Sequence, residues 1–98
     1  MNIYISVPMR GRSAAAINAD IAAAEVALGE LGYTPIRPVM ESKKDRNTCL
    51  GEAVTAVLNA DGIYLCKGWV HSEGCTLEKA AAELTAGKTI IYYDDFKK

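Results

Sequence analysis

The sequence predicts an α/β fold in which helices cover both faces of a parallel sheet. Four short segments rich in β-branched and aromatic residues alternate with three longer segments whose apolar residues recur at the helical period. Such alternation is typical of β-α units, whose right-handed crossovers place helices on either side of a parallel sheet. The chain has 98 residues, a length that suits one domain, and we expect a single domain over residues 1–98.

The first half of the chain contains two predicted strands and one predicted helix. Residues 2–6 (NIYIS) form a short β-rich run that ends at a loop with proline and glycine. Ser13 is a suitable N-cap for a helix that extends to about Leu31, followed by Gly32 as the C′ residue. The apolar face of this helix would consist of Ile17, Ile21, Ala24, Leu28 and Leu31. Residues 33–38 contain two prolines, which favours a short edge strand.

The middle of the chain predicts a loop, a helix and a buried strand. Residues 39–48 are polar and aperiodic, and the loop that they predict is long enough to cover a site. A helix fits residues 49–59. Its inward side chains would be Leu50, Val54, Val57 and Leu58. The apolar run at 62–66 then predicts the third strand.

The last part of the chain predicts a third helix and a fourth strand. The helix would extend from about Gly74 to Ala86. Its apolar side would consist of Leu77, Ala80, Ala81 and Leu84. Residues 88–93 (KTIIYY) predict the fourth strand. The polar tail after it either frays or docks through Phe96.

Composition and charge exclude several classes of partner. Half of the residues are hydrophobic and 23% are charged, which is typical of a folded globular chain. The formal net charge of −1 gives no electrostatic reason to expect nucleic acid or an anionic membrane as the main partner. No apolar run approaches the roughly 20 residues that span a bilayer. The N-terminus lacks a signal-peptide pattern, so we expect a cytoplasmic protein.

The cysteines and the single histidine argue against a metal centre. Cys49, Cys66 and Cys75 are odd in number and lack CxxC spacing, and His71 is the only histidine. We therefore expect no disulfide framework and no metal centre, in a reducing compartment. Cys66 fits a core position. Cys75 is either a partly buried small residue or a thiol whose pKa is lowered by a helix N-terminus.

The order of the elements favours a flavodoxin-like (Rossmann-like) three-layer sandwich with strand order 2-1-3-4. In this order the direction of winding reverses between the first and third strands. Ligands of open α/β sheets bind at such a switch point, beyond the carboxyl ends of the strands. The loops at 7–12 and 67–74 would line this crevice, and they are also the loops richest in chemically useful side chains.

The first of these loops has the properties of an anion site. Met9, Arg10 and Gly11 offer backbone amides, a guanidinium group and a glycine that permits close approach, all near a helix start. The segment matches neither the Walker A nor the GxGxxG pattern, so the motif has low specificity. The alternative interpretation is a solvated connection with surface arginines.

The second loop supplies hydroxyl, amide and carboxylate groups. Ser72 would cap the third helix or bind a ligand oxygen, and Gly74 suits either close approach or a plain turn. Trp69 would form a pocket wall, a packing contact or a subunit contact. His71 is expected to be exposed and has no assigned role. Glu78 is either a nucleophile at the crevice or an ordinary glutamate favoured near a helix N-terminus by the macrodipole.

Three motifs resemble one known superfamily. The segments YIS-x-PMRG at 4–11, AD-x-IYL at 60–65 and GW-x-x-S-x-G-x-x-x-E at 68–78 resemble nucleoside 2-deoxyribosyltransferase-like proteins, nearest to small uncharacterised phage and bacterial members. The resemblance extends over essentially the whole chain. It implies a flavodoxin-like fold and cleavage or transfer at the N-glycosidic bond of 2′-deoxynucleosides or, in the branch that matches better, their 5′-monophosphates. The implied reaction needs no metal and no organic cofactor.

The resemblance also assigns site residues. It places the nucleophile on Glu78 and a 5′-phosphate contact on Ser72, and it matches the phosphate loop of the hydrolase branch through Arg10 and Gly11. With the two loops considered above, the expected substrate-binding residues are Tyr4, Ser6, Met9, Arg10, Gly11, Ser72 and Gly74. Superfamily members typically pair so that a neighbour closes the site, and we expect a homo-oligomer here, with residues 49–59 and the Trp69 region as candidate contacts.

Two departures from the superfamily pattern keep other functions open. Ala53 stands where an aspartate that contacts the sugar or assists the leaving base is usual, with only Glu52 nearby, and Val7 replaces a common glycine. Either Glu52 or a neighbouring subunit would replace the aspartate, or the protein binds without turnover. The alternative function is therefore a catalytically silent nucleotide-binding module, and a third possibility is a purely structural subunit.

Overall fold

The structure is a computed structural model that describes residues 1–38 and 45–96. The helices and strands are, in order, β1 (Asn2–Ser6), α1 (Ala14–Glu30), β2 (Thr34–Ile36), α2 (Arg46–Asn59), β3 (Gly62–Leu65), α3 (Glu73–Glu83) and β4 (Thr89–Tyr92). Two short 3-10 helices, η1 (Trp69–His71) and η2 (Tyr93–Phe96), precede α3 and follow β4.

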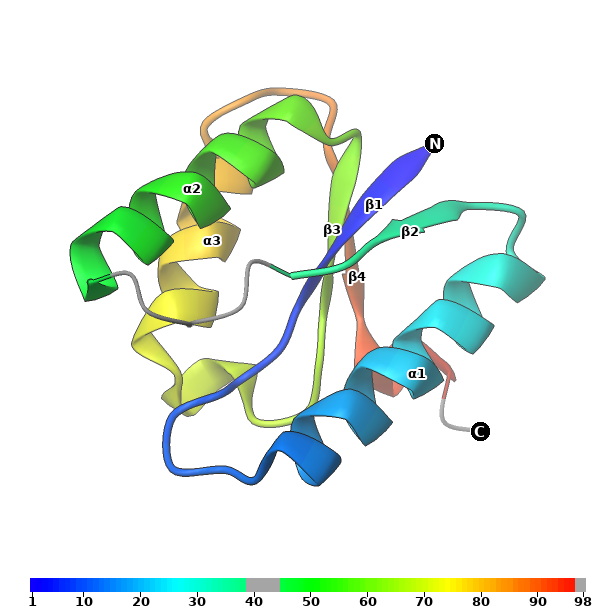
Figure 1. Ribbon diagram of the computed structural model, residues 1–98. Helices are drawn as coiled ribbons and strands as arrows, with labels where there is room; N and C mark the ends of the chain where they lie inside the picture. The colour runs from blue at the N-terminus through cyan, green and yellow to red at the C-terminus, as the bar shows by residue number, and fades with distance from the viewer. Residues whose placement is uncertain (39–44, 97–98) are drawn as a thin grey trace.

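The four strands form one parallel sheet in the order β2-β1-β3-β4 (Figure 1). This arrangement confirms the predicted α/β class and the flavodoxin-like order 2-1-3-4. β1 lies between its neighbours, pairing Ile3 with Pro35 on one side and with Gly62 on the other. β1 and β3 are adjacent, so the loops that follow them emerge side by side at one end of the sheet.

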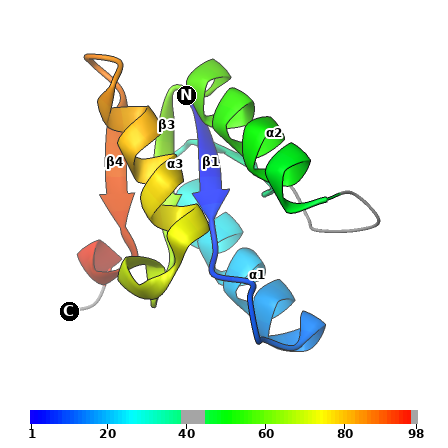
Figure 2. The same ribbon diagram turned by 90° about the vertical axis from the view of Figure 1, so that its left-hand side faces the viewer.

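Helices cover the sheet on both faces. α1 lies against one face, and α2 and α3 lie against the other (Figures 1 and 2). Successive side chains of a strand point to opposite faces. Accordingly Ile3 and Ile5 join the core cluster on the α1 side, whereas Tyr4 joins the cluster on the α2–α3 side. Both faces of β1 are therefore buried, which explains its continuous apolar run.

β3 and β4 approach so closely that glycine is needed at their start. A Cβ atom on Gly62 would lie 2.4 Å from the carbonyl oxygen of Thr89 and 3.0 Å from the Cδ1 atom of Ile3. The first atom belongs to the backbone and cannot rotate away. Gly62 therefore fixes the spacing at the end of the sheet opposite the switch-point loops.

The ends of α1 largely follow the sequence prediction. Ser13 is the N-cap, and its hydroxyl accepts a hydrogen bond from the backbone N–H of Ala16 at 3.1 Å. Gly32 follows the helix with a φ of 79°, as expected for a C′ glycine. Leu31 was predicted on the buried face, and this is wrong: it is the C-cap residue and is 49% exposed, because the helix ends before another inward turn is completed.

α2 begins earlier than the sequence predicted. Asp45 is its N-cap and accepts a hydrogen bond from the backbone N–H of Thr48, so residues 45–48 belong to the cap and first turn instead of the predicted loop. These residues are polar and exposed, and apolar periodicity does not detect them. Leu58, predicted to point inward, is 44% exposed. Residues 39–44, the rest of the predicted loop, lie outside the described residues.

α3 is rotated relative to the prediction. Leu77, Ala80 and Leu84 were predicted to face the core, but all three are exposed. The buried residues of α3 are Cys75, Glu78, Ala81 and Ala82. Small side chains let the helix pack closely on the sheet, and the buried carboxylate among them is satisfied by hydrogen bonds.

After β4 the chain forms η2, and the predicted docking of Phe96 falls on a side chain outside the described residues. Within residues 1–38 and 45–96, no helix has the length and apolar character needed to cross a membrane.

Candidate functional site

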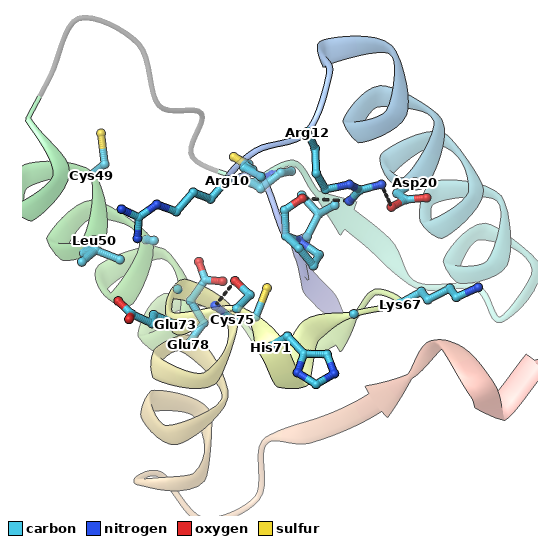
Figure 3. Close-up of a pocket in the computed structure, with 18 of the residues that line it drawn as sticks. Arg10, Arg12, Asp20, Cys49, Leu50, Lys67, His71, Glu73, Cys75 and Glu78 are labelled. Carbon is cyan, nitrogen blue, oxygen red and sulfur yellow. Dashed lines mark hydrogen bonds and ion pairs between the residues drawn. The ribbon is translucent and has the colours of Figure 1, made fainter.

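A cleft of about 580 Å³ lies at the carboxyl ends of β1 and β3. Its walls come from the loop after β1, the segment before α3, the first turns of α3 and one face of α2 (Figure 3). This is the switch point that the strand order predicted. The cleft-lining residues used below are Tyr4, Met9, Arg10, Arg46, Cys49, Leu50, Ala53, Ser72, Glu73, Gly74, Cys75 and Glu78.

Glu78 is buried at the cleft and held by two hydroxyl groups of β1. The residue is only 7% exposed. The Oγ atom of Ser6 donates a hydrogen bond to Glu78 Oε1 at 2.6 Å, and the hydroxyl of Tyr4 donates one to Oε2 at 2.9 Å. Each carboxylate oxygen therefore has a donor from the adjacent strand, which fixes the orientation of the carboxyl group.

The surroundings of Glu78 act on its pKa in two directions. Burial raises the pKa of the carboxyl above its ordinary value of 4.5, because the charged form loses water. The hydrogen bonds from Ser6 and Tyr4 oppose this rise, since they stabilise the carboxylate. Burial is the larger effect, so Glu78 stays protonated to a higher pH than a surface glutamate does.

The local sequence explains this arrangement. Tyr4 and Ser6 are two residues apart on a strand, so both point to the face that α3 covers. Ser72 begins α3 as its N-cap, accepting a hydrogen bond from the backbone N–H of Cys75 at 3.2 Å. Glu78 lies six residues later and thus faces the sheet together with Cys75. The structure thus places Glu78 on the inner face of α3.

The loop after β1 places Arg10 at the cleft, whereas Arg12 binds neighbouring groups of the protein. A turn with a hydrogen bond from the N–H of Arg12 to the carbonyl of Met9 contains Gly11, whose φ of 73° favours glycine. Arg10, within this turn, is exposed and extends toward α2 (Figure 3). Arg12 instead binds the carboxylate of Asp20 at 2.7 Å and the carbonyl of Pro8 at 2.8 Å.

The residues around the start of α3 include its N-cap, Ser72, and further residues that line the cleft. Ser72 performs the predicted capping role. Gly74 lines the cleft, and a Cβ there would meet only ordinary contacts. Trp69 packs on Tyr92, with 5.7 Å between the ring centroids, which supports the packing interpretation. His71 is exposed, as expected, although it borders the cleft.

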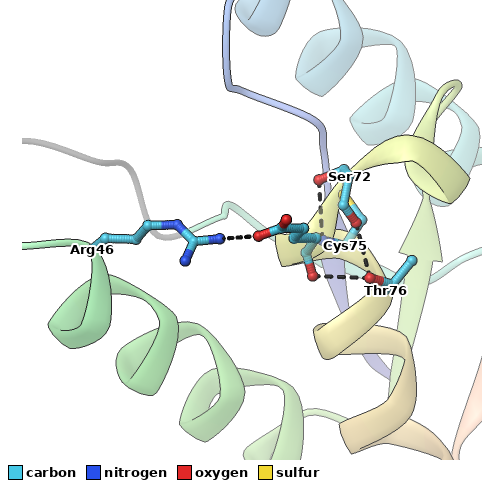
Figure 4. A network of polar contacts seen from close by, with 5 residues as sticks. Arg46, Ser72, Cys75 and Thr76 are labelled. Atoms are coloured by element: carbon cyan, nitrogen blue, oxygen red, sulfur yellow. Dashed lines mark hydrogen bonds and ion pairs between the residues drawn. The ribbon is translucent and has the colours of Figure 1, made fainter.

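An ion pair connects α2 and α3 beside the cleft. Arg46 Nη2 lies 2.6 Å from Glu73 Oε2 (Figure 4). The two side chains are 49% and 78% exposed, respectively. Arg46 is the first residue of α2 and Glu73 the first of α3, so the pair joins two helix starts.

The three cysteines are free and buried. Burial raises the pKa of the Cys66 thiol to about 12, and it also raises the pKa of the Cys75 thiol, which the hydroxyls of Ser6 and Ser72 partly oppose. The lowered pKa considered for Cys75 is thus wrong, because loss of solvent outweighs the helix N-terminus. Over the described part of the chain, no group of three His, Cys, Asp or Glu side chains could hold a metal ion.

Comparison with known sequences provides a family. Residues 1–92 match a family described as "Domain of unknown function (DUF4406)". The chain belongs to the DUF4406 family. The match extends from β1 to the end of β4 and so includes every residue that lines the cleft. No curated protein and no solved structure matches this DUF4406 chain.

Most of the predicted site residues meet at the cleft of this DUF4406 protein. Tyr4, Met9, Arg10, Ser72, Gly74 and Glu78 line it. Ser6 is not a lining residue but donates a hydrogen bond to Glu78, which is one, and Gly11 shapes the turn that carries Arg10.

Sequence patterns did not reveal that Cys49 and Leu50 of α2 form part of the cleft wall, nor the ion pair of Arg46 and Glu73 beside it. Ala53, which the resemblance had placed in the site, lies in the same wall. Asp45 followed three residues later by Thr48 is an N-cap signal that could have located the start of α2 and with it Arg46. Ala53 faces the cleft, whereas Glu52 is not among the described lining residues.

Proposed function

We propose that this protein cleaves, or transfers at, the N-glycosidic bond of 2′-deoxynucleosides, more specifically of their 5′-monophosphates. The observation that supports the proposal best is the buried Glu78 carboxylate at the cleft, with Ser6 and Tyr4 on its two oxygens. A surface glutamate chosen for the helix macrodipole would need neither burial nor two hydroxyl donors. The motifs that resemble the nucleoside 2-deoxyribosyltransferase-like superfamily support the same proposal.

In the proposed mechanism Glu78 is the nucleophile. One carboxylate oxygen forms a bond to the anomeric carbon, and the bond from that carbon to the base nitrogen breaks with its electron pair going to the base, which takes a proton from water. Water then attacks the same carbon, the ester to Glu78 breaks, and a proton is released. A second base in place of water gives transfer instead of hydrolysis. The missing 2′-hydroxyl makes the cationic transition state easier to reach.

The rest of the cleft suits a 5′-phosphate. Arg10 carries a guanidinium group at the mouth of the cleft, and Ser72 and Gly74 lie at the start of α3, where backbone N–H groups and the helix dipole favour an anion. A phosphate bound here would place its sugar toward Glu78. Binding energy from this remote group would then orient the reacting carbon.

A direct experiment tests the reaction. The protein is incubated with the four 2′-deoxynucleosides and their 5′-monophosphates, and free base is measured by chromatography. Glu78→Gln is expected to reduce base release by at least about a thousandfold, because the nucleophile is lost. Glu83→Gln, on an exposed position of the same helix, is the matched control and should retain full activity. Base release by Glu78→Gln at the wild-type rate would refute the mechanism.

A catalytically silent nucleotide-binding module is the second candidate. Ala53 lines the cleft where the resemblance implies an aspartate. The other described acids of the cleft, Asp20 and Glu73, are engaged in ion pairs with arginines. A thermal-shift measurement with the same ligand panel separates the two functions. Stabilisation by nucleotides without release of any base would favour the binding module.

A further inference from the structure

Two arginines from different elements border the mouth of the cleft. Arg10 lies in the turn after β1 and extends toward Cys49 and Leu50 of α2 (Figure 3). Arg46 begins α2 and lines the same cleft. Each guanidinium group presents several N–H donors in a planar fork that matches carboxylate or phosphate oxygens. The mouth therefore contains more donor capacity than a single carboxylate can use.

Glu73 occupies part of this donor capacity in the free protein. Its Oε2 atom lies 2.6 Å from Arg46 Nη2, while Arg10 forms no ion pair with any residue that the structure describes. Glu73 stands in the sequence between Ser72 and Gly74, the residues assigned above to the phosphate end of the cleft. An anionic group of the protein thus lies where the anionic group of the ligand is expected.

We propose that Glu73 is an internal substitute for the ligand phosphate, and that a 5′-phosphate displaces it from Arg46, which then binds the phosphate together with Arg10. The proposal rests on the proposed function insofar as the ligand is a 5′-phosphorylated nucleoside. No covalent step is involved. Arg46 is thereby a specificity residue that selects phosphorylated over unphosphorylated ligands.

The exposure of the pair makes the exchange favourable. The Arg46 and Glu73 side chains are 49% and 78% exposed, and ion pairs in such surroundings contribute little because water screens both charges. A phosphate dianion has more charge than a carboxylate and three acceptor oxygens, so it can engage two guanidinium groups at once. A neutral nucleoside offers nothing that competes with Glu73, and it leaves Arg46 engaged.

The experiment measures affinity by titration calorimetry for the four 2′-deoxynucleoside 5′-monophosphates. All proteins carry Glu78→Gln so that the ligand is not consumed. Arg46→Gln is expected to weaken binding about tenfold or more, as for loss of a charge-assisted hydrogen bond. Glu73→Gln is expected to strengthen binding about two- to fivefold, the range of an exposed ion pair. Arg37→Gln, which breaks the exposed pair with Glu25 elsewhere, is the control and should change nothing.

A double variant tests whether Glu73 acts through Arg46. With Arg46→Gln already present, Glu73→Gln should no longer strengthen binding, because the guanidinium group for which Glu73 and the phosphate compete is absent. Unchanged affinity in Arg46→Gln or weaker binding in Glu73→Gln overturns the inference and leaves the proposed function standing. No binding of any monophosphate would overturn both the inference and the choice of 5′-monophosphates as substrates. Base release by the wild type, together with unchanged affinity in Arg46→Gln, refutes only the inference. The expected affinity changes in the Arg46 and Glu73 variants, without base release by the wild type, refute only the catalysis.

Discussion

Ser6 and Glu78 are 72 residues apart in the sequence, and the Ser6 hydroxyl donates a 2.6 Å hydrogen bond to the Glu78 carboxylate. Ser6 is completely buried and Glu78 nearly so. A hydroxyl on the central strand thus holds the carboxylate that we propose as the nucleophile. The contact joins the sheet to α3 and makes the protonation state of Glu78 depend on β1.

Replacing Ser6 by alanine is expected to shift the pH dependence of base release. The nucleophile must be deprotonated, so activity should rise with pH through the pKa of Glu78, which burial already raises above 4.5. Loss of the Ser6 donor removes an interaction that lowers this pKa, so the acidic limb should move to higher pH. Profiles of kcat/KM against pH measure this. Thr55→Ala, which removes an exposed hydroxyl bound to the carbonyl of Gly51, should leave the limb in place. An unmoved limb in Ser6→Ala would show that the bond does not tune Glu78.

The burial of Glu78 is expected to reduce stability at neutral pH. Its folded-state pKa is raised, so below pH 4.5 the group is protonated in both states and burial of charge costs nothing. As the pH rises above 4.5, the unfolded chain releases the proton first, and stability falls until the folded-state pKa is passed. Glu78→Gln should therefore be more stable than wild type at pH 7, with a difference that shrinks below pH 4.5. Urea unfolding between pH 4 and 8 tests this, with Glu83→Gln as control, and a destabilised Glu78→Gln at pH 7 would contradict it.

The close approach at Gly62 gives a prediction about the sheet. Gly62→Ala places a Cβ 2.4 Å from the carbonyl oxygen of Thr89, and the required backbone shift should cost about 1–3 kcal/mol of unfolding free energy. Gly51→Ala is the matched control. Gly51 is exposed within α2 with open space around it, and alanine there should add about 0.5–1 kcal/mol. Denaturant titration of both variants gives the comparison. Equal stability of Gly62→Ala and wild type would mean that the strands can separate freely.

The outward face of α3 bears on the expected homo-oligomer. Leu77 and Leu84 are 42% and 83% exposed, and Val70 in η1 is 57% exposed. If copies of the chain associate through this face, Leu84→Glu should shift the protein toward monomer, because it places a charge among apolar side chains. Size-exclusion chromatography with light scattering measures the mass. Val26→Glu, at a position of α1 that is 63% exposed, is the control. A wild type that is monomeric at high concentration would contradict the expectation.

The sequence carried the strand order and most element boundaries, because both depend on local pattern. The alternation of short apolar runs with segments of helical period predicts the 2-1-3-4 sheet. Ser13 and Ser72, the N-cap residues of α1 and α3, indicate where these helices start. The start of α2 was missed because its first turn is polar. The N-cap residue Asp45, and not a row of buried apolar side chains, defines the start of α2.

The orientation of α3 could not be deduced from its own residues. The helix has alanines on several sides, so the stripe through Leu77 and Leu84 fits helical periodicity as well as the stripe that is buried. The correct rotation depends on hydroxyls of β1 that satisfy Glu78 from across the fold. The resemblance of the motifs therefore pointed to residues that meet at the cleft, but their partners are set by contacts between distant segments.

Tyr4 belongs both to the apolar cluster beneath α2 and α3 and to the cleft wall, where it bonds Glu78. The floor of the cleft is thus made from the protein interior itself and not from an appended loop. On heating, ligand binding and tertiary structure should be lost at one temperature, because the floor of the cleft can unfold only together with the core cluster that contains Tyr4. Engineering a different pocket shape would likewise demand a repacked interior.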